Sequence, residues 1–286
     1  MIKQLFFIFL FLLAGCDNGS SENDEAVYIE YDCSGIITFP DKSFEKDIRQ
    51  TLSNGLGYDD TEDIQGADLE SLHYMYAMNI QLTDINGVQC AENVIAVNFS
   101  NNKITDILPL KKLTNPVEIF LSNNTISNLS PLENLTNLVS LRVDINNVTD
   151  ISPLHNLTKL IWLYLSYNKI SDISPLKNLT NLTILKLVDN KISNISTLKK
   201  MKKLKFLYLS QNKIKDISPL KGLTALKTLY LYDNKITDLS PLVQNKGLDK
   251  TTSVYLAGNP INCKNQAANI KALKKRGVKL LLNCPG

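Results

Sequence analysis

Apolar residues recur along most of this chain with a period of 22 residues. Single asparagines mark the period, and each follows the pattern L-x-x-L-x-L-x-x-N, as in Leu160, Leu163, Leu165 and Asn168. After each asparagine come mostly Ile at plus two, Ile or Leu at plus five and Leu at plus eight. A fixed period of this length indicates a repeat architecture. The asparagines are Asn102, Asn124, Asn146, Asn168, Asn190, Asn212 and Asn234, with Asn259 following after 25 residues.

Each period predicts one coil of a solenoid. The segment x-L-x-L-x alternates, so it indicates a short strand with inward leucines, and neighbouring strands should form a parallel sheet. Ser-Pro-Leu, as at residues 152–154, fixes φ and discourages a long helix, so the convex side should be extended or 3₁₀. The asparagine amide is expected to hydrogen-bond backbone groups of adjacent coils. A degenerate copy from Leu72 to Ile85 brings the number of coils to about nine.

One phrase of the repeat resembles a known family. N-K-I-S-D-I-S-P-L-x-N-L-T-N-L, at residues 168–182, is similar to the repeat of internalin-type bacterial leucine-rich repeat proteins of the 22-residue class. The resemblance covers residues 72–262. It implies an α/β repeat solenoid with short parallel strands on the concave face, which is the surface that such solenoids use to bind partners.

Both ends of the array need caps, because terminal coils would otherwise expose core leucines. Residues 28–71 resemble the helical N-terminal cap of such proteins, with Asp41 or Ser43 as the expected N-cap residue. Residues 263–286 resemble a disulfide-closed C-terminal cap, in which Gly277 can end a helix. Four apolar residues at near-helical spacing support the first helix: Phe39, Phe44, Ile48 and Leu52.

The first 15 residues have the form of a secretory signal peptide, with one Lys before a ten-residue apolar run and small residues at the end. Leu13-Ala14-Gly15-Cys16 resembles the lipobox of bacterial lipoproteins, which implies a lipid on Cys16 and a membrane anchor. Residues 16–27 are polar and predict a flexible tether. The expected location is the bacterial cell envelope, either periplasmic or surface-exposed.

Four further cysteines predict two disulfides, because they form an even number in an exported chain. Three connectivities are open, and position along the chain favours one pair near each end. No C-x-x-C spacing is present, so no zinc site is expected. The four residues are Cys33, Cys90, Cys263 and Cys284.

The sequence contains no pattern typical of a catalytic site. It lacks a Walker loop, G-x-G-x-x-G, H-E-x-x-H and G-x-S-x-G, and the acidic run 59–70 does not fit an EF-hand frame. We therefore predict no enzyme activity, no cofactor and no metal site. Residues 17–70 carry a net charge of −12 and residues 71–286 a net charge of +14. The basic part suits an acidic partner, but nucleic acid is not expected for an exported, anchored protein.

Aromatic residues concentrate at the solvent-facing strand positions. Five of the nine central facing positions are Tyr, and the only Trp of the chain lies beside them. Tyr, Trp and Arg dominate binding hot spots, because they bury a large area with few rotatable bonds and carry a polar group. We therefore predict that this surface binds a partner. The candidate residues are Arg142, Trp162, Tyr164, Tyr167, Lys186, Phe206, Tyr208, Tyr230, Tyr232 and Tyr255.

The leading hypothesis is a lipid-anchored, non-enzymatic envelope protein that binds another protein through its concave aromatic face, in adhesion or host interaction. A second hypothesis is binding of an anionic glycan or lipopolysaccharide through basic residues, notably the lysines of 196–205 and residues 274–276. A third is a structural lipoprotein of a larger envelope assembly.

Overall fold

The computed structural model describes residues 32–57 and 61–284. These residues belong to one compact unit that spans residues 31–286. The predicted signal peptide, the lipidation site Cys16 and the tether lie outside the described residues. Within the described ranges, no helix has the length and apolar character needed to span a membrane.

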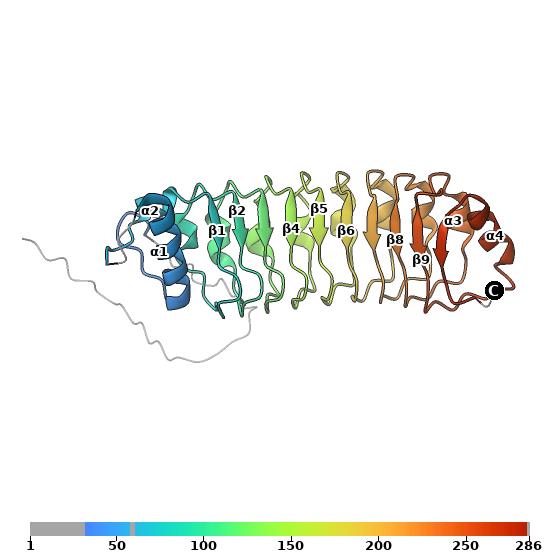
Figure 1. Cartoon of the computed structure of the whole chain (residues 1–286), viewed down its shortest axis with the longest axis horizontal. Coiled ribbons are helices and arrows are strands. Elements are labelled where there is room, and N and C mark those ends of the chain that lie inside the picture. The colour runs from blue at the N-terminus through green and yellow to red at the C-terminus, as the bar shows by residue number, and fades with distance from the viewer. Residues whose placement is uncertain (1–31, 58–60, 285–286) are drawn as a thin grey trace, which may run out of the picture. The chain divides into compact units, whose positions relative to one another are not determined.

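Ten parallel strands form one sheet in the order of the sequence, β1 to β10 (Figure 1). Each strand pairs with the equivalent residues of the next coil, so Leu141 lies beside Leu163 and Leu163 beside Leu185. The α/β repeat solenoid predicted from the 22-residue period is therefore confirmed. The strands are β1 Tyr74–Tyr76, β2 Ala96–Asn98, β3 Glu118–Phe120, β4 Ser140–Arg142, β5 Trp162–Tyr164, β6 Ile184–Lys186, β7 Phe206–Tyr208, β8 Thr228–Tyr230, β9 Ser253–Tyr255 and β10 Lys279–Leu281.

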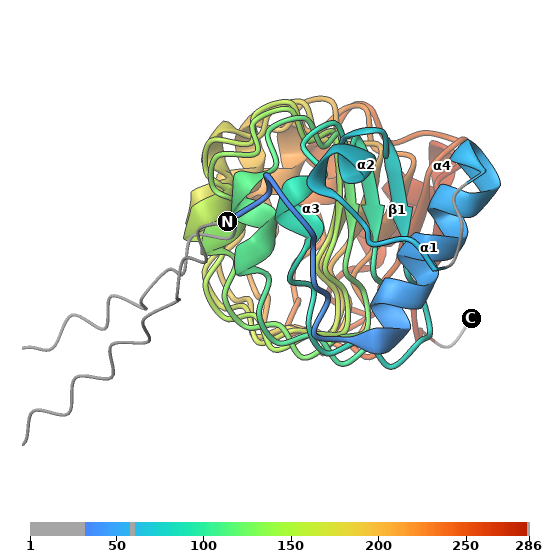
Figure 2. The same cartoon turned by 90° about the vertical axis from the view of Figure 1, so that its left-hand side faces the viewer.

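Short helices lie on the side of the coils opposite the strands (Figure 2). Most begin at Ser-Pro-Leu, where Pro fixes φ near helical values, and the Asp or Asn two residues before Ser caps the turn. In η4, Asp150 Oδ1 accepts from the Ser152 N–H at 2.8 Å. The expected 3₁₀ structure is confirmed in η1 to η7, of which η6 forms without the Pro, whereas the last of these helices, α3, is α-helical. The helices are η1 Val88–Cys90, η2 Leu108–Lys112, η3 Ser130–Leu132, η4 Ser152–Leu154, η5 Ser174–Asn178, η6 Ser196–Lys200, η7 Ser218–Gly222 and α3 Ser240–Gln244.

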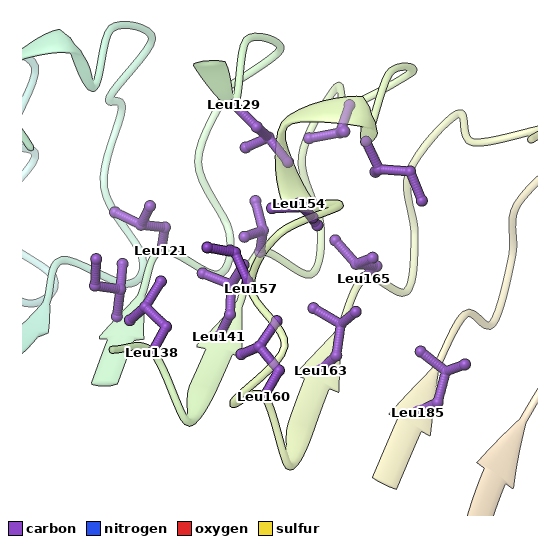
Figure 3. Packing of buried hydrophobic residues seen from close by; sticks show 14 of the residues in the cluster. Leu121, Leu129, Leu138, Leu141, Leu154, Leu157, Leu160, Leu163, Leu165 and Leu185 are labelled. Atoms are coloured by element: carbon purple, nitrogen blue, oxygen red, sulfur yellow. The ribbon is translucent and has the colours of Figure 1, made fainter. Parts of the chain in front are cut away.

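The interior is filled by rows of equivalent leucines and isoleucines from successive coils (Figure 3). Leu141, Leu163 and Leu185 of the strands are fully buried, as are Leu154 of η4 and Leu176 of η5. Each buried leucine contributes roughly 1.5–3 kcal/mol of hydrophobic stabilisation. Each coil packs its buried residues against those of the neighbouring coils, so the core is continuous along the stack.

The asparagines of the repeat form the expected hydrogen-bond ladder. Asn168 Nδ2 donates to the carbonyl of Val143 at 2.9 Å and to that of Leu165 at 3.2 Å, and its Oδ1 accepts from the Val148 N–H at 2.9 Å. Asn190 repeats these contacts one coil further on. The ladder satisfies backbone groups that the turn would otherwise leave buried and unpaired.

The N-terminal cap contains α1 Lys42–Leu56 and α2 Gly66–Glu70. Asp41, rather than Ser43, is the N-cap of α1, and its carboxylate accepts from the backbone N–H of Ser43 at 2.9 Å. Phe44 is fully buried. Its ring packs edge-on against Phe39 and against Phe99 of the first coils, with 5.5 Å between ring centroids in each case. The cap therefore covers the leucine core, which the first coil would otherwise expose.

The C-terminal cap contains α4 Ala267–Lys275 and the strand β10. Gly277 follows α4 with φ +81°, a conformation that suits glycine. The sequence predicts about nine coils and does not predict β10. This strand forms because the cap continues the ladder, with Leu256 N–H donating to the Leu281 carbonyl at 2.7 Å.

Two disulfides close the two caps. Cys33 bonds to Cys90, with 5.4 Å between the Cα atoms, and joins the N-terminal cap to η1. Cys263 bonds to Cys284, with a Cα separation of 5.7 Å, within the C-terminal cap. Disulfides persist in oxidising compartments, so this unit matures outside the cytoplasm.

Candidate binding surface

The first and third residues of each strand face away from the leucine core and form the surface that we call the sheet face. The middle residue of each strand points inward, as Leu163 does between Trp162 and Tyr164. The third residues form a central row in which neighbours are paired partners across adjacent strands. The row consists of Tyr76, Asn98, Phe120, Arg142, Tyr164, Lys186, Tyr208, Tyr230 and Tyr255.

The middle of this row alternates aromatic rings with cations. The guanidinium of Arg142 lies 4.8 Å from the ring centroid of Phe120 and 4.5 Å from that of Tyr164. The Lys186 ammonium lies 4.9 Å from the ring centroid of Tyr164 and 5.0 Å from that of Tyr208. Each cation thus sits between two rings, within the range of a cation–π interaction. These contacts hold flexible side chains in place before any partner arrives.

The row continues as a stack of three tyrosines. The rings of Tyr208 and Tyr230 are 4.8 Å apart and nearly parallel, and those of Tyr230 and Tyr255 are 4.2 Å apart. This spacing follows from the distance between paired strands. A hydrogen bond with Tyr255, followed by burial, raises the pKa of Tyr230 to about 12, so this phenol remains neutral at physiological pH. Since ring faces are covered by neighbours, a partner meets mainly ring edges and hydroxyl groups.

The ten residues predicted from the sequence all lie on or beside the sheet face, but they differ in exposure. Trp162 is 38% exposed and Tyr167 is 50% exposed, whereas Phe206 and Tyr230 are partly buried against their neighbours. The aromatic residues of the second half therefore form an ordered stack, while Trp162 and Tyr167 are the more accessible ones.

Residues just before the ladder asparagines adopt a left-handed backbone. Most are Asn, Asp, Gln or Gly, which tolerate this conformation best, but Ile145 has φ +55° and Tyr167 has φ +56°. Ile145 is 49% exposed and was missed in the sequence, because its position reads as an ordinary turn. The residues of this left-handed row are Asn79, Asn101, Asn123, Ile145, Tyr167, Asp189, Gln211, Asp233 and Gly258.

A second residue missed in the sequence is Asp144, which lies between Arg142 and Ile145 along the chain. Its Oδ1 accepts from the Ser166 N–H at 2.9 Å, and its Oδ2 accepts from the Ser122 hydroxyl at 3.4 Å. Burial raises the pKa of Asp144 above its ordinary value despite these hydrogen bonds. A partly buried carboxylate thus lies within the sheet face.

A hollow of about 280 Å³ opens beside the tyrosine stack. We call it the tyrosine hollow. It is formed by β7, β8 and the turns that follow β5, β6, β7 and β8. It is lined by Tyr167, Val188, Tyr208, Ser210, Gln211, Tyr230, Tyr232 and Asp233. The sequence predicted the four tyrosines but not the polar residues that join them.

The lysines of 196–205 lie away from the sheet face, on η6 and in the turn that precedes β7. Lys202 Nζ donates to the Gly222 carbonyl at 3.0 Å, and Lys203 Nζ donates to Asn181 Oδ1 at 2.7 Å. Arg276, at the end of α4, donates to the Asn245 carbonyl at 2.9 Å. Part of this basic group therefore holds the fold together. In the described ranges, no three His, Cys, Asp or Glu side chains gather as metal ligands would.

The stacked strands, the buried leucine rows and the asparagine ladder define a leucine-rich repeat protein. A family model described as "Leucine Rich repeats (2 copies)" matches residues 158–200 and 202–244. No curated protein matches the chain in sequence. Proteins of this class present an extended sheet face to their partners and are typically modules of protein interaction.

Solved structures of two internalins from Listeria monocytogenes are similar to this chain. Internalin C2 is 34% identical with a TM-score of 0.69, and the match covers 78% of this chain and 94% of that one. The internalin InlF is 30% identical with a TM-score of 0.69, and the match covers 85% of this chain and 75% of that one. The chain belongs to the internalin family of leucine-rich repeat proteins, as the repeat phrase suggested.

The fold also resembles a leucine-rich repeat protein of Leptospira interrogans. That protein is 24% identical with a TM-score of 0.62, and the match covers 68% of this chain and 51% of that one. At this level of identity the likeness concerns the fold alone.

Proposed function

We propose that this chain is a non-enzymatic, lipid-anchored envelope protein that binds a protein partner through its sheet face, in adhesion or host interaction. The observation that carries the proposal is the continuous row from Phe120 to Tyr255, in which cations and rings hold one another in place. A pre-organised aromatic surface lowers the entropic cost of association. The proposed contact residues are those predicted from the sequence, together with Ile145.

The first test identifies the partner and shows which side of the solenoid it contacts. A photo-crosslinking amino acid is placed at Tyr167, beside the sheet face, and, as a matched control, at the exposed Lys177 on the opposite side. We expect crosslinks to one protein from envelope or host extracts at Tyr167 and none at Lys177. Crosslinking at Lys177 alone would contradict the proposed surface.

The second step measures the affinity of the purified partner by calorimetry. The triple variant Trp162→Ala, Tyr164→Ala and Tyr208→Ala removes three anchors, each worth about 2 kcal/mol or more at a hot spot. We expect affinity to fall at least 30-fold, which is the effect of about 2 kcal/mol from a single anchor, since each 1.4 kcal/mol changes affinity tenfold and losses at hot spots do not add up. Circular dichroism checks that the variant is folded. Unchanged affinity in the folded variant would exclude the aromatic row as the contact.

The lipid anchor rests on the sequence around Cys16, which lies outside the described residues. We expect metabolic labelling with palmitate in the natural chain and its loss in Cys16→Ala. Protease treatment of intact and permeabilised cells then separates the two locations. Cleavage on intact cells favours adhesion or host contact, and protection until permeabilisation favours a periplasmic partner.

An alternative function is binding of an anionic glycan or lipopolysaccharide. A hollow of about 330 Å³ on the helix side, lined by Lys199, Lys202 and Lys221 among others, favours it. This hypothesis predicts that heparin, used as the probe, binds with a steep salt dependence and that Lys199→Glu with Lys200→Glu abolishes binding. Salt-insensitive binding would exclude it. A structural role in an envelope assembly would instead appear as a stoichiometric subunit in purification.

A further inference from the structure

The tyrosine hollow lies where a partner bound to the sheet face would meet it. Tyr208 and Tyr230 come from the strands β7 and β8, and Val188, Ser210 and Tyr232 occupy equivalent positions of three successive coils. At about 280 Å³ the hollow is slightly smaller than a typical small-molecule site. Its size therefore suits one long side chain of a partner rather than a whole cofactor.

The hollow combines aromatic rings with an unneutralised negative charge. Asp233 is exposed, and within residues 32–57 and 61–284 it takes part in no ion pair. Its charge acts on Tyr232, whose pKa is raised chiefly by burial and further by the phenol of Tyr255 and the carboxylate of Asp233. Gln211 adds a neutral amide at the same edge. Rings beside a carboxylate attract a cation and repel an anion.

The same row shows that these rings accept cations. Lys186 lies 5.0 Å from the ring centroid of Tyr208, on the side opposite Tyr230. Tyr167 is half exposed, so its ring remains open to a group that enters the hollow. The covered faces of Tyr230 leave no flat platform for a sugar ring or a proline. A compact cation, by contrast, needs only the one open ring face, that of Tyr167, together with the carboxylate and the hydroxyl oxygens of the tyrosines.

A buried hydroxyl without a partner is an independent sign that a ligand completes this site. Ser210 is 1% exposed, lines the hollow, and its Oγ forms no hydrogen bond. In the equivalent position of another coil, Ser166 Oγ accepts from the Val188 N–H at 3.2 Å. Buried polar groups are nearly always paired in native proteins. An N–H donor inserted into the hollow would supply the missing partner.

We infer that the tyrosine hollow takes the cationic side chain, Arg or Lys, of the partner protein. This inference rests on the proposed function and names the chemistry of the partner's anchor residue. The ring hydroxyls and edges surround the apolar stem, the Asp233 carboxylate pairs with the charged head, and the Ser210 hydroxyl accepts from one of its N–H groups.

The test uses small probes, so it needs no knowledge of the partner. Nα-acetyl-arginine amide and Nα-acetyl-lysine amide are titrated into the folded protein, and the tyrosine ring signals are followed by NMR. We expect saturable shifts with at least one of these cations and none with Nα-acetyl-citrulline amide, the neutral analogue of arginine. Asp233→Asn should weaken binding at least fivefold. Glu133→Gln, the same charge change at the exposed residue that follows η3, should leave it unchanged.

Ser210 provides a second variant with a distinct signature. Ser210→Ala removes the unpaired hydroxyl, so we expect a higher Tm together with two- to fivefold weaker binding of the cation. Ser166→Ala removes a paired hydroxyl and should lower Tm without changing binding. A lower Tm in Ser210→Ala with unchanged binding would assign its hydroxyl to the fold alone.

Three outcomes would overturn the inference. These are equal binding of the citrulline probe, equal binding by Asp233→Asn, or tighter binding of phosphocholine, which would indicate a lipid headgroup. The proposed function fails separately. If the partner needs Trp162 and Tyr164 but not Asp233, the sheet face stands and the inference is wrong. If the cation binds but substitutions on the sheet face do not change the affinity for the partner, the proposed function is wrong.

Discussion

Ile145 adopts a backbone conformation that its own side chain disfavours. At φ +55° the Cβ approaches the following carbonyl, which costs about 1–2 kcal/mol for most residues other than glycine. Asn101 and Asn123 fill the equivalent positions of two earlier coils with a residue that tolerates this geometry. An exposed, strained apolar residue beside Arg142 has no role in the core, and such strain is found preferentially at functional sites.

Ile145→Asn should therefore stabilise the fold. We expect an increase of about 1 kcal/mol in the free energy of unfolding, because Asn accepts the left-handed backbone. The measurement is urea unfolding followed by circular dichroism. The reciprocal change Asn123→Ile, at φ +57°, serves as the control and should lower stability by a similar amount. A loss of stability in Ile145→Asn would mean that the side chain makes contacts that outweigh the strain.

For single residues, the sequence predicts well which side chains are buried, but it predicts poorly which buried hydroxyl groups have a hydrogen-bond partner. The leucines and ladder asparagines were predictable because every coil imposes the same environment on them. Ser166 and Ser210 occupy the same repeat position, yet only Ser166 Oγ has a partner. That difference depends on small shifts between adjacent coils, which the repeat pattern does not encode. The tyrosine hollow was missed for the same reason.

The C-terminal cap is the part of the fold that is packed least firmly against its neighbours. The strand β10 pairs only with β9, and its residues Lys279 and Leu281 are exposed. Besides this pairing, the buried Leu273 of α4 and the hydrogen bond from Arg276 to the Asn245 carbonyl hold the cap against the array. The disulfide Cys263–Cys284 closes the cap itself. A terminal coil in a solenoid has one neighbour rather than two, so it opens more easily than the interior.

Removing this disulfide should open the cap without unfolding the array. The double variant Cys263→Ser with Cys284→Ser loses a cross-link whose loop of about 20 residues stabilises by roughly 3 kcal/mol. Hydrogen exchange should accelerate in α4 and β10, while the coils around Asn168 keep their protection. The matched variant Cys33→Ser with Cys90→Ser should affect the N-terminal cap instead. Exchange that accelerates evenly along the chain would show that the solenoid unfolds as one unit.

Element by element, the repeat predicted the strands and 3₁₀ turns, whereas the caps were less well specified. The sequence left Asp41 and Ser43 open as the N-cap, and the hydrogen bond to the Ser43 N–H decides for Asp41. The segment around Lys279–Leu281 lacks the repeat phrase, so β10 was missed. Its strand conformation comes from pairing with β9, a tertiary effect that local sequence does not determine.

In the molecule as a whole, the side chains of the sheet face are separated by the distance between neighbouring strands. The distance between Trp162 and the tyrosine stack is set by the number of coils between them. One coil, with Lys186 at its centre, separates Tyr164 from Tyr208. A partner that contacts both regions must therefore match this spacing. Removing the coil between them changes the spacing and takes away one proposed contact residue, Lys186.

Deleting residues 169–190 should preserve the fold and impair recognition. The deletion joins Asn168 to Lys191, which restores the phrase N-K-I and leaves every remaining coil in register. The sheet face shortens by about 4.8 Å, the distance between paired strands. We expect cooperative unfolding at a slightly lower Tm. The partner identified by crosslinking should bind at least tenfold more weakly, as measured by calorimetry. Deleting residues 103–124 removes Phe120 at the end of the row but keeps the spacing from Arg142 to Tyr255. It should therefore lower Tm similarly and weaken binding much less than the first deletion. Equal affinity in both deletions would mean that the partner contacts only one of the two regions.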